Sequence, residues 1–337
     1  MCRDIIKEDC EQFVKLLIDS KLDIEKLKNK TLLITGGTGF FGKWLLTTFL
    51  YANSFFKLNS RCVVLSRNSS SFLKIFPEFK NSALKFIDGD VRDFDICESH
   101  LDFIIHAATP ASATLERDDP AEMRSIIVDG AKHIVEIARK SNSPKILFTS
   151  SGGVYGSAIE NKPFKETDEC IPTTVYGLAK LDAERVLLQS GVEVVVARCF
   201  AFVGPYLELD IHYAIGNFIN DVIKNRPIVI KGDGTPVRSY MYSLDLMLWL
   251  WTLLIRGGTG GIYNVGSDIP VSIKELACLV AGSDTKVKLA TRICNEGSTR
   301  SYYLPSIHKF EKELGLSLSY ALNESITRTL NWNLRKK

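Results

Sequence analysis

A buried strand, a glycine turn and a helix start follow one another at residues 31–50, and this order restricts the fold more than any other feature. Thr31–Thr35 is an apolar, β-branched run of the kind that forms a fully buried parallel strand. Gly36, Gly39 and Gly42 follow with the spacing of a dinucleotide-binding turn, in which backbone N–H groups at a helix start face a pyrophosphate. The segment therefore predicts the first βα unit of a Rossmann-like domain.

Further strands alternate with helical segments after this unit. The six strand candidates are Thr31–Thr35, Arg61–Ser66, Lys85–Asp88, Phe103–His106, Lys145–Thr149 and Val192–Arg198. Such alternation predicts an α/β fold with a doubly wound parallel sheet. We expect residues 1–29 to add a helix, residues 30–204 to form the nucleotide-binding domain, and residues 205–337 to form most of a smaller, mainly helical substrate lobe. Within the last segment, residues 227–245 are expected to return to the nucleotide-binding domain.

Composition excludes several classes of function. The chain has 337 residues, with 42 Lys and Arg against 39 Asp and Glu, so it lacks the basic footprint of a nucleic-acid-binding protein. Its 8 Cys residues form no C-x-x-C pair, which indicates reduced thiols in a cytoplasmic protein and no metal site. The charged N-terminus argues against a secretory signal. The apolar run Leu246–Ile255 is too short to span a membrane and predicts a buried helix.

Tyr176 and Lys180 lie four residues apart, downstream of Ser151. A Tyr and a Lys at this spacing share one helix face, where the ammonium would favour the ionised phenol and lower a pKa that is normally about 10. Such a phenol exchanges a proton with an alcohol oxygen near neutral pH, and the Ser151 hydroxyl would polarise the same oxygen. The three residues predict a hydride-transfer site beside a nicotinamide.

Taken together, these segments resemble the extended short-chain dehydrogenase/reductases, and in particular the branch that modifies nucleotide-sugars. The resemblance extends over residues 30–316. Its motifs, in order, are Thr35–Gly42, Asp88–Asp93, His106–Ala108, Ser150–Gly156, Tyr176–Lys180, Ala197–Phe200 with Val203–Pro205, Arg238–Tyr242 before Asp245, and Tyr263–Gly266.

The resemblance implies a role for residues in each motif, and it makes Ser151, Tyr176 and Lys180 the catalytic residues. The implied cofactor-binding residues are Gly36, Thr38, Gly39, Phe40, Phe41, Gly42, Ser66, Arg67, Asn68, Asp90, Val91, Ala107, Ala108, Thr149, Tyr176, Lys180, Phe200 and Val203. The implied substrate-binding residues are Thr109, Ser151, Gly152, Gly153, Asn217, Phe218 and Arg238. Among them, Arg238 would hold the diphosphate of a nucleotide-sugar. The resemblance also implies a homodimer.

The end of the second strand bears on the choice of cofactor. A carboxylate there would bind the adenosine ribose of NAD and repel the 2′-phosphate of NADP, but the strand ends in Ser66-Arg67-Asn68. Arg67 can pair with a phosphate. NADP(H) is therefore favoured, and NAD(H) stays possible because a neutral pocket accepts either ribose.

The residues after Ser151 bear on the reaction. Related 4,6-dehydratases carry an Asp-Glu pair there to move the protons of water elimination, whereas this chain has Gly152 and Gly153. The favoured function is an NADP(H)-dependent oxidoreductase that reduces the C4 ketone of a nucleotide-linked 4-keto-6-deoxyhexose. The alternative is an NAD-dependent nucleotide-sugar 4-epimerase or 4,6-dehydratase that retains its cofactor. A non-catalytic dinucleotide-binding relative is a third, less favoured interpretation.

Overall fold

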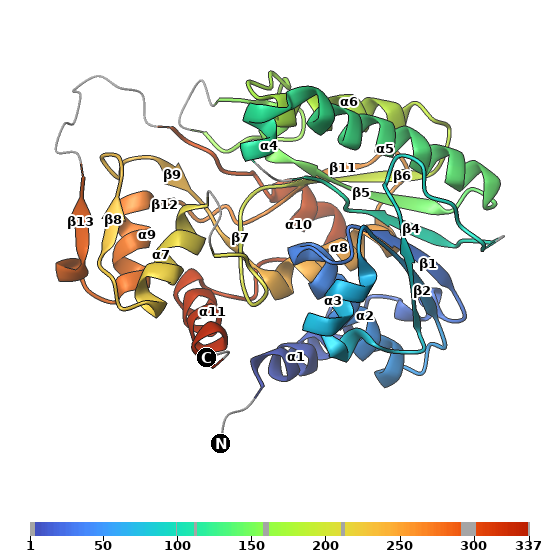
Figure 1. The fold of residues 1–337 in the computed structure, drawn as a ribbon, viewed down its shortest axis with the longest axis horizontal. Coiled ribbons are helices and arrows are strands. Elements are labelled where there is room, and N and C mark those ends of the chain that lie inside the picture. The colour runs from blue at the N-terminus through green and yellow to red at the C-terminus, as the bar shows by residue number, and fades with distance from the viewer. Residues whose placement is uncertain are drawn as a thin grey trace.

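A sheet of seven parallel strands forms the centre of the molecule (Figure 1). The computed structural model describes residues 4–98, 100–110, 113–157, 162–209, 213–290 and 301–335. The strands are β1 (Thr31–Thr35), β2 (Arg61–Ser66), β3 (Leu84–Asp88), β4 (Phe103–His106), β5 (Lys145–Ser151), β6 (Val194–Cys199) and β11 (Ile262–Val265). Their order is β11-β6-β5-β4-β1-β2-β3, so the direction of winding changes between β1 and β4. Ligands of such sheets bind at the carboxyl ends of the strands beside this change of direction.

Helices cover both faces of the sheet (Figure 1). One face packs against α1 (Ile5–Asp19), α2 (Phe40–Phe55), α8 (Ser243–Arg256) and α10 (His308–Leu314). The other packs against α5 (Pro120–Lys140) and α6 (Val175–Leu188), which lie side by side, with α4 (Ala113–Asp118) next to α5. The short elements are α3 (Ser69–Ile75) and the 3-10 turns η1 (Ile24–Leu27), η2 (Pro77–Phe79), η3 (Gly152–Tyr155) and η4 (Asp284–Lys286), of which η3 is buried against α6.

A smaller lobe lies beyond the carboxyl ends of the strands, at the left of Figure 1. Its helices are α7 (Ala214–Ile223), α9 (Ile273–Ala281) and α11 (Leu322–Arg335). Short strand pairs join them: β8 (Ile228–Ile230) with β13 (Val287–Leu289), β9 (Val237–Arg238) with β12 (Val271–Ser272), and β10 (Met241–Tyr242) with β7 (Phe202–Val203). The three helices share an apolar core with residues of β7, β8 and β12, separate from the two cores that flank the sheet, whereas Met241 and Tyr242 of β10 belong to one of the flanking cores.

The structure confirms the predicted fold class and corrects its details. All six predicted strands are present, each within two residues of its expected ends, but the prediction omits β11, the edge strand. Within the segment 227–245, β8 pairs with β13 inside the lobe, whereas Met241, Tyr242 and Leu244 pack in the core beside the sheet, and the chain continues through α8 to β11. The run Leu246–Ile255 is a buried helix as predicted, and no helix of the described segments is long and apolar enough to cross a membrane.

Candidate active site

The glycine turn between β1 and α2 brings two backbone segments into direct contact. Gly36 has a φ of 71°, and a Cβ atom there would lie 2.6 Å from the Ala107 carbonyl oxygen after β4. A Cβ atom on Gly42 would lie 2.3 Å from the Gly36 carbonyl oxygen, so both positions admit only glycine. Gly39 is exposed, and its nearest neighbour would be 3.5 Å away, so open space remains at the start of α2. This cradle fits a pyrophosphate facing a helix N-terminus.

A buried polar pair holds the adjoining turn after β4. The Nδ1 atom of His106 lies 2.8 Å from the Thr35 hydroxyl oxygen, which also accepts a hydrogen bond of 3.1 Å from the Ala108 amide. Burial, together with the positive charge of Lys180, lowers the pKa of His106 to about 3. His106 is therefore neutral and positions the backbone of Ala107 and Ala108 beside the cradle.

The edge formed by β2 and β3 carries an acid that the sequence argument did not find there. Asp88 ends β3 directly opposite Ser66 in the strand register, and its carboxylate accepts a 2.7 Å hydrogen bond from the Ser69 amide. Asn68 caps α3 through its side chain, and Arg67 is exposed. A carboxylate thus lies beside the end of β2, and a carboxylate that faces the adenosine ribose favours NAD over NADP.

The next turn is less available to a ligand than expected. The Asp90 carboxylate accepts two hydrogen bonds of 2.8 Å from the Arg92 guanidinium, and these hold the pKa of Asp90 below its usual range. The Val91 side chain is buried against Gly130 of α5. Only the backbone of Val91 can therefore face a cofactor.

The structure brings Ser151, Tyr176 and Lys180 together at the carboxyl end of β5. Ser151 ends the strand, and its hydroxyl accepts a 3.0 Å hydrogen bond from the Gly153 amide. Tyr176 and Lys180 occupy the first two turns of α6, which packs against β5 and η3. The Lys180 ammonium is buried and donates to the Thr109 hydroxyl at 2.5 Å and to the Thr149 carbonyl at 2.7 Å. Thr109, expected to bind substrate, therefore contacts the lysine.

The electrostatics of Tyr176 differ from the sequence prediction. Burial raises the pKa of Tyr176 above its ordinary value, and a hydrogen bond with Ser151 only partly opposes this. The Lys180 ammonium lies 6.0 Å from the centre of the Tyr176 ring and 4.7 Å from that of Phe148, so it is not paired with the phenol. The predicted lowering of the Tyr176 pKa by Lys180 is absent in this structure. The phenol is protonated here and is poised as a proton donor.

Lys180 gives a testable pH dependence. Burial lowers its pKa from 10.5 to about 7, so between these values the unfolded chain binds one more proton than the folded protein. The free energy of unfolding should therefore rise with pH from about pH 7 to 9, by up to about 1.4 kcal/mol per unit from this residue. Urea unfolding at several pH values should show a steeper rise for the wild type than for Lys180→Met. Equal slopes would mean that Lys180 stays charged in the folded protein.

Tyr303 belongs to the site although the sequence analysis missed it. A Cβ atom on Gly152 would lie 2.5 Å from the Tyr303 hydroxyl oxygen and 2.7 Å from two atoms of the Phe200 ring. The rings of Tyr303 and Phe200 are 4.8 Å apart, and Ser151 hydrogen-bonds with Tyr303 as well as Tyr176. No local motif distinguishes Tyr303 from Tyr302, because only the tertiary fold brings it to Gly152.

Arg238 lies in a cavity next to this cluster. The cavity has a volume of about 290 Å³ and is lined by Gly156, Ser157, Arg238, Ser301, Tyr302 and Tyr303. The Arg238 guanidinium lies 5.8 Å from the centre of the Tyr303 ring and donates to the hydroxyl and carbonyl oxygens of Ser301. Tyr303 thus lies between Arg238, which is predicted to bind the diphosphate, and Ser151 of the predicted hydride-transfer site.

The remaining predicted residues divide into two groups. Phe40 and Phe41 are half-buried at the start of α2, and Asn217 is exposed on α7, so each can face a ligand. Thr38 is half-buried in the glycine turn, and Thr149 is buried beside Lys180. The Val203 and Phe218 side chains are instead buried in the apolar core of the lobe, and their predicted roles in ligand binding stay predictions.

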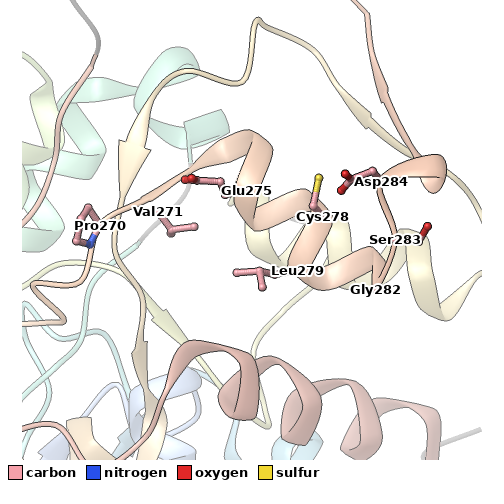
Figure 2. A pocket seen from close by; sticks show the side chains of 8 residues that line it. All are labelled: Pro270, Val271, Glu275, Cys278, Leu279, Gly282, Ser283 and Asp284. Atoms are coloured by element: carbon pink, nitrogen blue, oxygen red, sulfur yellow. The ribbon is translucent and has the colours of Figure 1, made fainter.

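A larger cavity lies away from these residues. It measures about 650 Å³ and is lined mainly by α9 and the turn that follows it (Figure 2). Of its acids, Glu275 is committed to the capping box of α9 with Ser272. None of the predicted site residues lines this cavity, so size alone does not identify the active site.

Comparison with known proteins identifies the family. Residues 32–266 match the model of the NAD dependent epimerase/dehydratase family. The chain belongs to this family. As a member of the NAD dependent epimerase/dehydratase family it is an enzyme of the short-chain dehydrogenase/reductase type, which confirms the resemblance seen in the sequence.

Family members of different activity are similar to the chain. Human dTDP-D-glucose 4,6-dehydratase is 26% identical over 330 residues, covering 90% of this chain and 89% of that protein. The putative UDP-glucose 4-epimerase of Methanocaldococcus jannaschii is 27% identical over 315 residues, covering 89% of this chain and 97% of that protein. The solved dTDP-glucose 4,6-dehydratase of Bacillus anthracis, in complex with NAD, has a TM-score of 0.77 at 18% identity and covers 91% of this chain and 97% of its own. At that identity the structural likeness supports the fold alone.

Proposed function

We propose that the protein is a nucleotide-sugar 4-epimerase that retains NAD. The observation that carries this proposal is the packing at Gly152, where Tyr303 and Phe200 fill the space that a side chain would need. A dehydratase needs a carboxylate near this point to remove the C5 proton of the sugar. The site has phenols and a hydroxyl in its place, which suffice for reversible oxidation at C4.

Neighbouring acids do not supply the carboxylate that a dehydratase needs. Glu116 accepts a 2.9 Å hydrogen bond from the backbone amide of Tyr176, and so caps α6. Glu184 is buried in an ion pair of 2.8 Å with Arg198 and accepts a hydrogen bond from Ser150. Both carboxylates are committed to backbone or cationic partners, so neither is free to act as a base on the substrate.

Three side chains would manage the proton of the substrate. Once ionised, Tyr176 takes the proton from the C4 hydroxyl when the sugar is oxidised and returns it when the ketone is reduced. Ser151 hydrogen-bonds the same oxygen, and Lys180 supplies positive charge that favours the phenolate once ligands displace its contact with Thr109. The chemistry that bound NAD supplies is the reversible transfer of a hydride. Epimerisation then requires the ketosugar to rotate, so that the hydride returns to the opposite face of C4.

The nucleotide part of the substrate would lie along the cavity beside Arg238. Its guanidinium is half-buried and held in place by Ser301, so it is preorganised for bidentate contact with a diphosphate. The match to the NAD dependent family, together with the dTDP-D-glucose 4,6-dehydratase and putative UDP-glucose 4-epimerase relatives, supports NAD and a nucleotide-sugar as the two ligands.

The test is incubation of the purified protein with UDP-glucose, UDP-N-acetylglucosamine and dTDP-glucose, followed by mass spectrometry and sugar analysis. An epimerase yields a product of unchanged mass without net change in nicotinamide absorbance. Loss of one water identifies a dehydratase and would overturn the proposal. Nicotinamide released by denaturing the protein should be NAD.

A reductase that uses NADP(H) is the second candidate, favoured by the exposed Arg67 at the end of β2. Consumption of NADPH with a nucleotide-linked 4-keto-6-deoxyhexose, and no epimerisation, would establish it. Its cofactor preference depends on which charge acts on the ribose, Arg67 or Asp88.

Two substitutions distinguish the effects of these two charges on cofactor binding. Asp88→Asn should strengthen binding of NADP relative to NAD by about tenfold, because a carboxylate that repels the 2′-phosphate is lost. Arg67→Ala should have the opposite, smaller effect, since an exposed guanidinium is screened by solvent. Titration of the apoprotein with each dinucleotide measures both ratios. An unchanged ratio in Asp88→Asn would exclude Asp88 from the ribose site.

A further inference from the structure

Helices α1 and α11 lie outside the family-matched residues 32–266, one on each side of them in the sequence, yet they meet in space. Figure 1 shows them close together at the bottom of the molecule. Their meeting point is the carboxylate of Asp9 on α1, which is 0% exposed. A fully buried carboxylate needs partners to offset the free-energy cost of its burial. The partners of Asp9 therefore show which elements α1 is attached to.

Asp9 has partners from two other elements. The Arg328 side chain of α11 donates to one carboxylate oxygen through Nη2 at 2.6 Å and Nε at 3.0 Å. The Tyr242 hydroxyl of β10 donates to the other oxygen at 2.5 Å. Arg328 also approaches the Tyr242 hydroxyl at 3.2 Å, which closes a triangle between α1, β10 and α11.

Each partner of Asp9 lies on an element next to predicted substrate-binding residues. Tyr242 lies four residues after Arg238, and its strand β10 pairs with β7, which follows Phe200. Helix α11 packs against α7, the helix that carries Asn217, and against β7 and β10. The other side of α1 packs on α2 and α8 of the nucleotide-binding domain, with Phe13 and Leu17 buried there. Asp9 therefore ties the substrate lobe to the rigid sheet layer.

We propose that Asp9 is a positioning residue for substrate binding: through Tyr242 and Arg328 it fixes β10 and α11, and so holds Arg238 and α7 over the carboxyl end of β5. The consequence for substrate binding relies on the function proposed above. The contact of Asp9 with Tyr242 and Arg328, which we call the clasp, does not. Its loss should loosen the lobe while the glycine cradle, built from β1, β4 and α2, keeps its geometry. Nucleotide-sugar affinity should fall and dinucleotide affinity should not.

The experiment compares Asp9→Ala and Tyr242→Phe with the wild type and with Glu8→Gln. Glu8 is the matched control, because it touches Arg328 only at 3.4 Å and its side chain is 34% exposed. UDP and dTDP are titrated as probes of the substrate site, NAD is titrated separately, and hydrogen exchange is followed in peptides of α11, β10 and α2. Tyr242→Phe keeps the ring that packs on Tyr320 and removes only the hydroxyl, so it tests the clasp if Asp9→Ala does not fold.

The dissociation constant of the nucleoside diphosphate should rise about tenfold in Asp9→Ala, with a smaller rise in Tyr242→Phe and none in Glu8→Gln. Exchange should accelerate in α11 and β10 and stay unchanged in α2. Equal losses of NAD and nucleotide affinity, or unchanged exchange in α11, would overturn the proposal. If the wild type binds neither UDP nor dTDP, the proposed function is what has failed, and the exchange of α11 alone then decides whether the clasp exists.

Discussion

Replacing Tyr176 with phenylalanine is expected to lower turnover of the nucleotide-sugar by about 10²- to 10⁴-fold, the usual contribution of a positioned acid–base group. The substitution removes the hydroxyl that exchanges the C4 proton. It leaves the ring, which packs against the core around α6, and it leaves the Lys180 contacts with Thr109 and Thr149. Folding and bound nicotinamide should therefore be retained, as thermal unfolding and cofactor release will show.

Tyr303→Phe is the matched control for this prediction. Both tyrosines are half-buried beside Ser151, and desolvation of the phenol raises the pKa of each. Tyr176 lies on the helix that carries Lys180, whereas Tyr303 lies beside Gly152 and Arg238. Turnover in Tyr303→Phe should fall by about tenfold at most, the effect of one lost hydrogen bond. If the two losses were reversed, Tyr303 would be the proton-transfer group.

Gly42→Ala is expected to disrupt the glycine turn. The added Cβ atom would lie 2.3 Å from the Gly36 carbonyl oxygen and 2.4 Å from the Gly37 Cα atom, and backbone atoms cannot rotate away as a side chain would. Forcing a methyl group into such a contact costs about 1–3 kcal/mol of folding free energy and displaces the turn. The melting temperature and dinucleotide affinity should both fall.

Gly39→Ala is expected to weaken dinucleotide binding without destabilising the fold. Gly39 has a φ of −77° and a ψ of −173°, which alanine adopts without strain, and the nearest atom to its Cβ would be 3.5 Å away. The apoprotein should therefore keep its melting temperature, while dinucleotide affinity falls because the methyl group occupies space at the helix start. Retained affinity in Gly39→Ala would show that the pyrophosphate does not approach this turn.

Motifs with short sequence spacing predicted much of the candidate site. The glycine turn depends on residues within seven positions, and Tyr176 and Lys180 are fixed by one helical turn, so their proximity follows from local geometry. Residues assigned singly from the resemblance have less local support. Val203 and Phe218 proved to be core residues of the lobe, because an apolar side chain gives no sign of which face of its element it occupies.

Cofactor preference illustrates a limit of a different kind. The sequence of β2 alone gave no acid at its end, but the register of β3 sets Asp88 opposite Ser66. Register between strands depends on the packing of both faces of the sheet and is not contained in either strand alone. The expectation of NADP(H) was drawn from β2 alone, without the acid that β3 sets beside it.

By itself, the sequence determined the parallel α/β fold and the position of the glycine turn, and it predicted Ser151, Tyr176 and Lys180 as the catalytic residues. These features depend on periodicity, glycine conformation and spacing within one element, which act locally along the chain. Only the tertiary structure decided what surrounds them: Tyr303 against Gly152, the burial that raises the pKa of Tyr176, and the contact of Asp9 with Arg328. Those contacts join residues far apart in sequence, and they exist only when the separate cores of sheet and lobe have packed together.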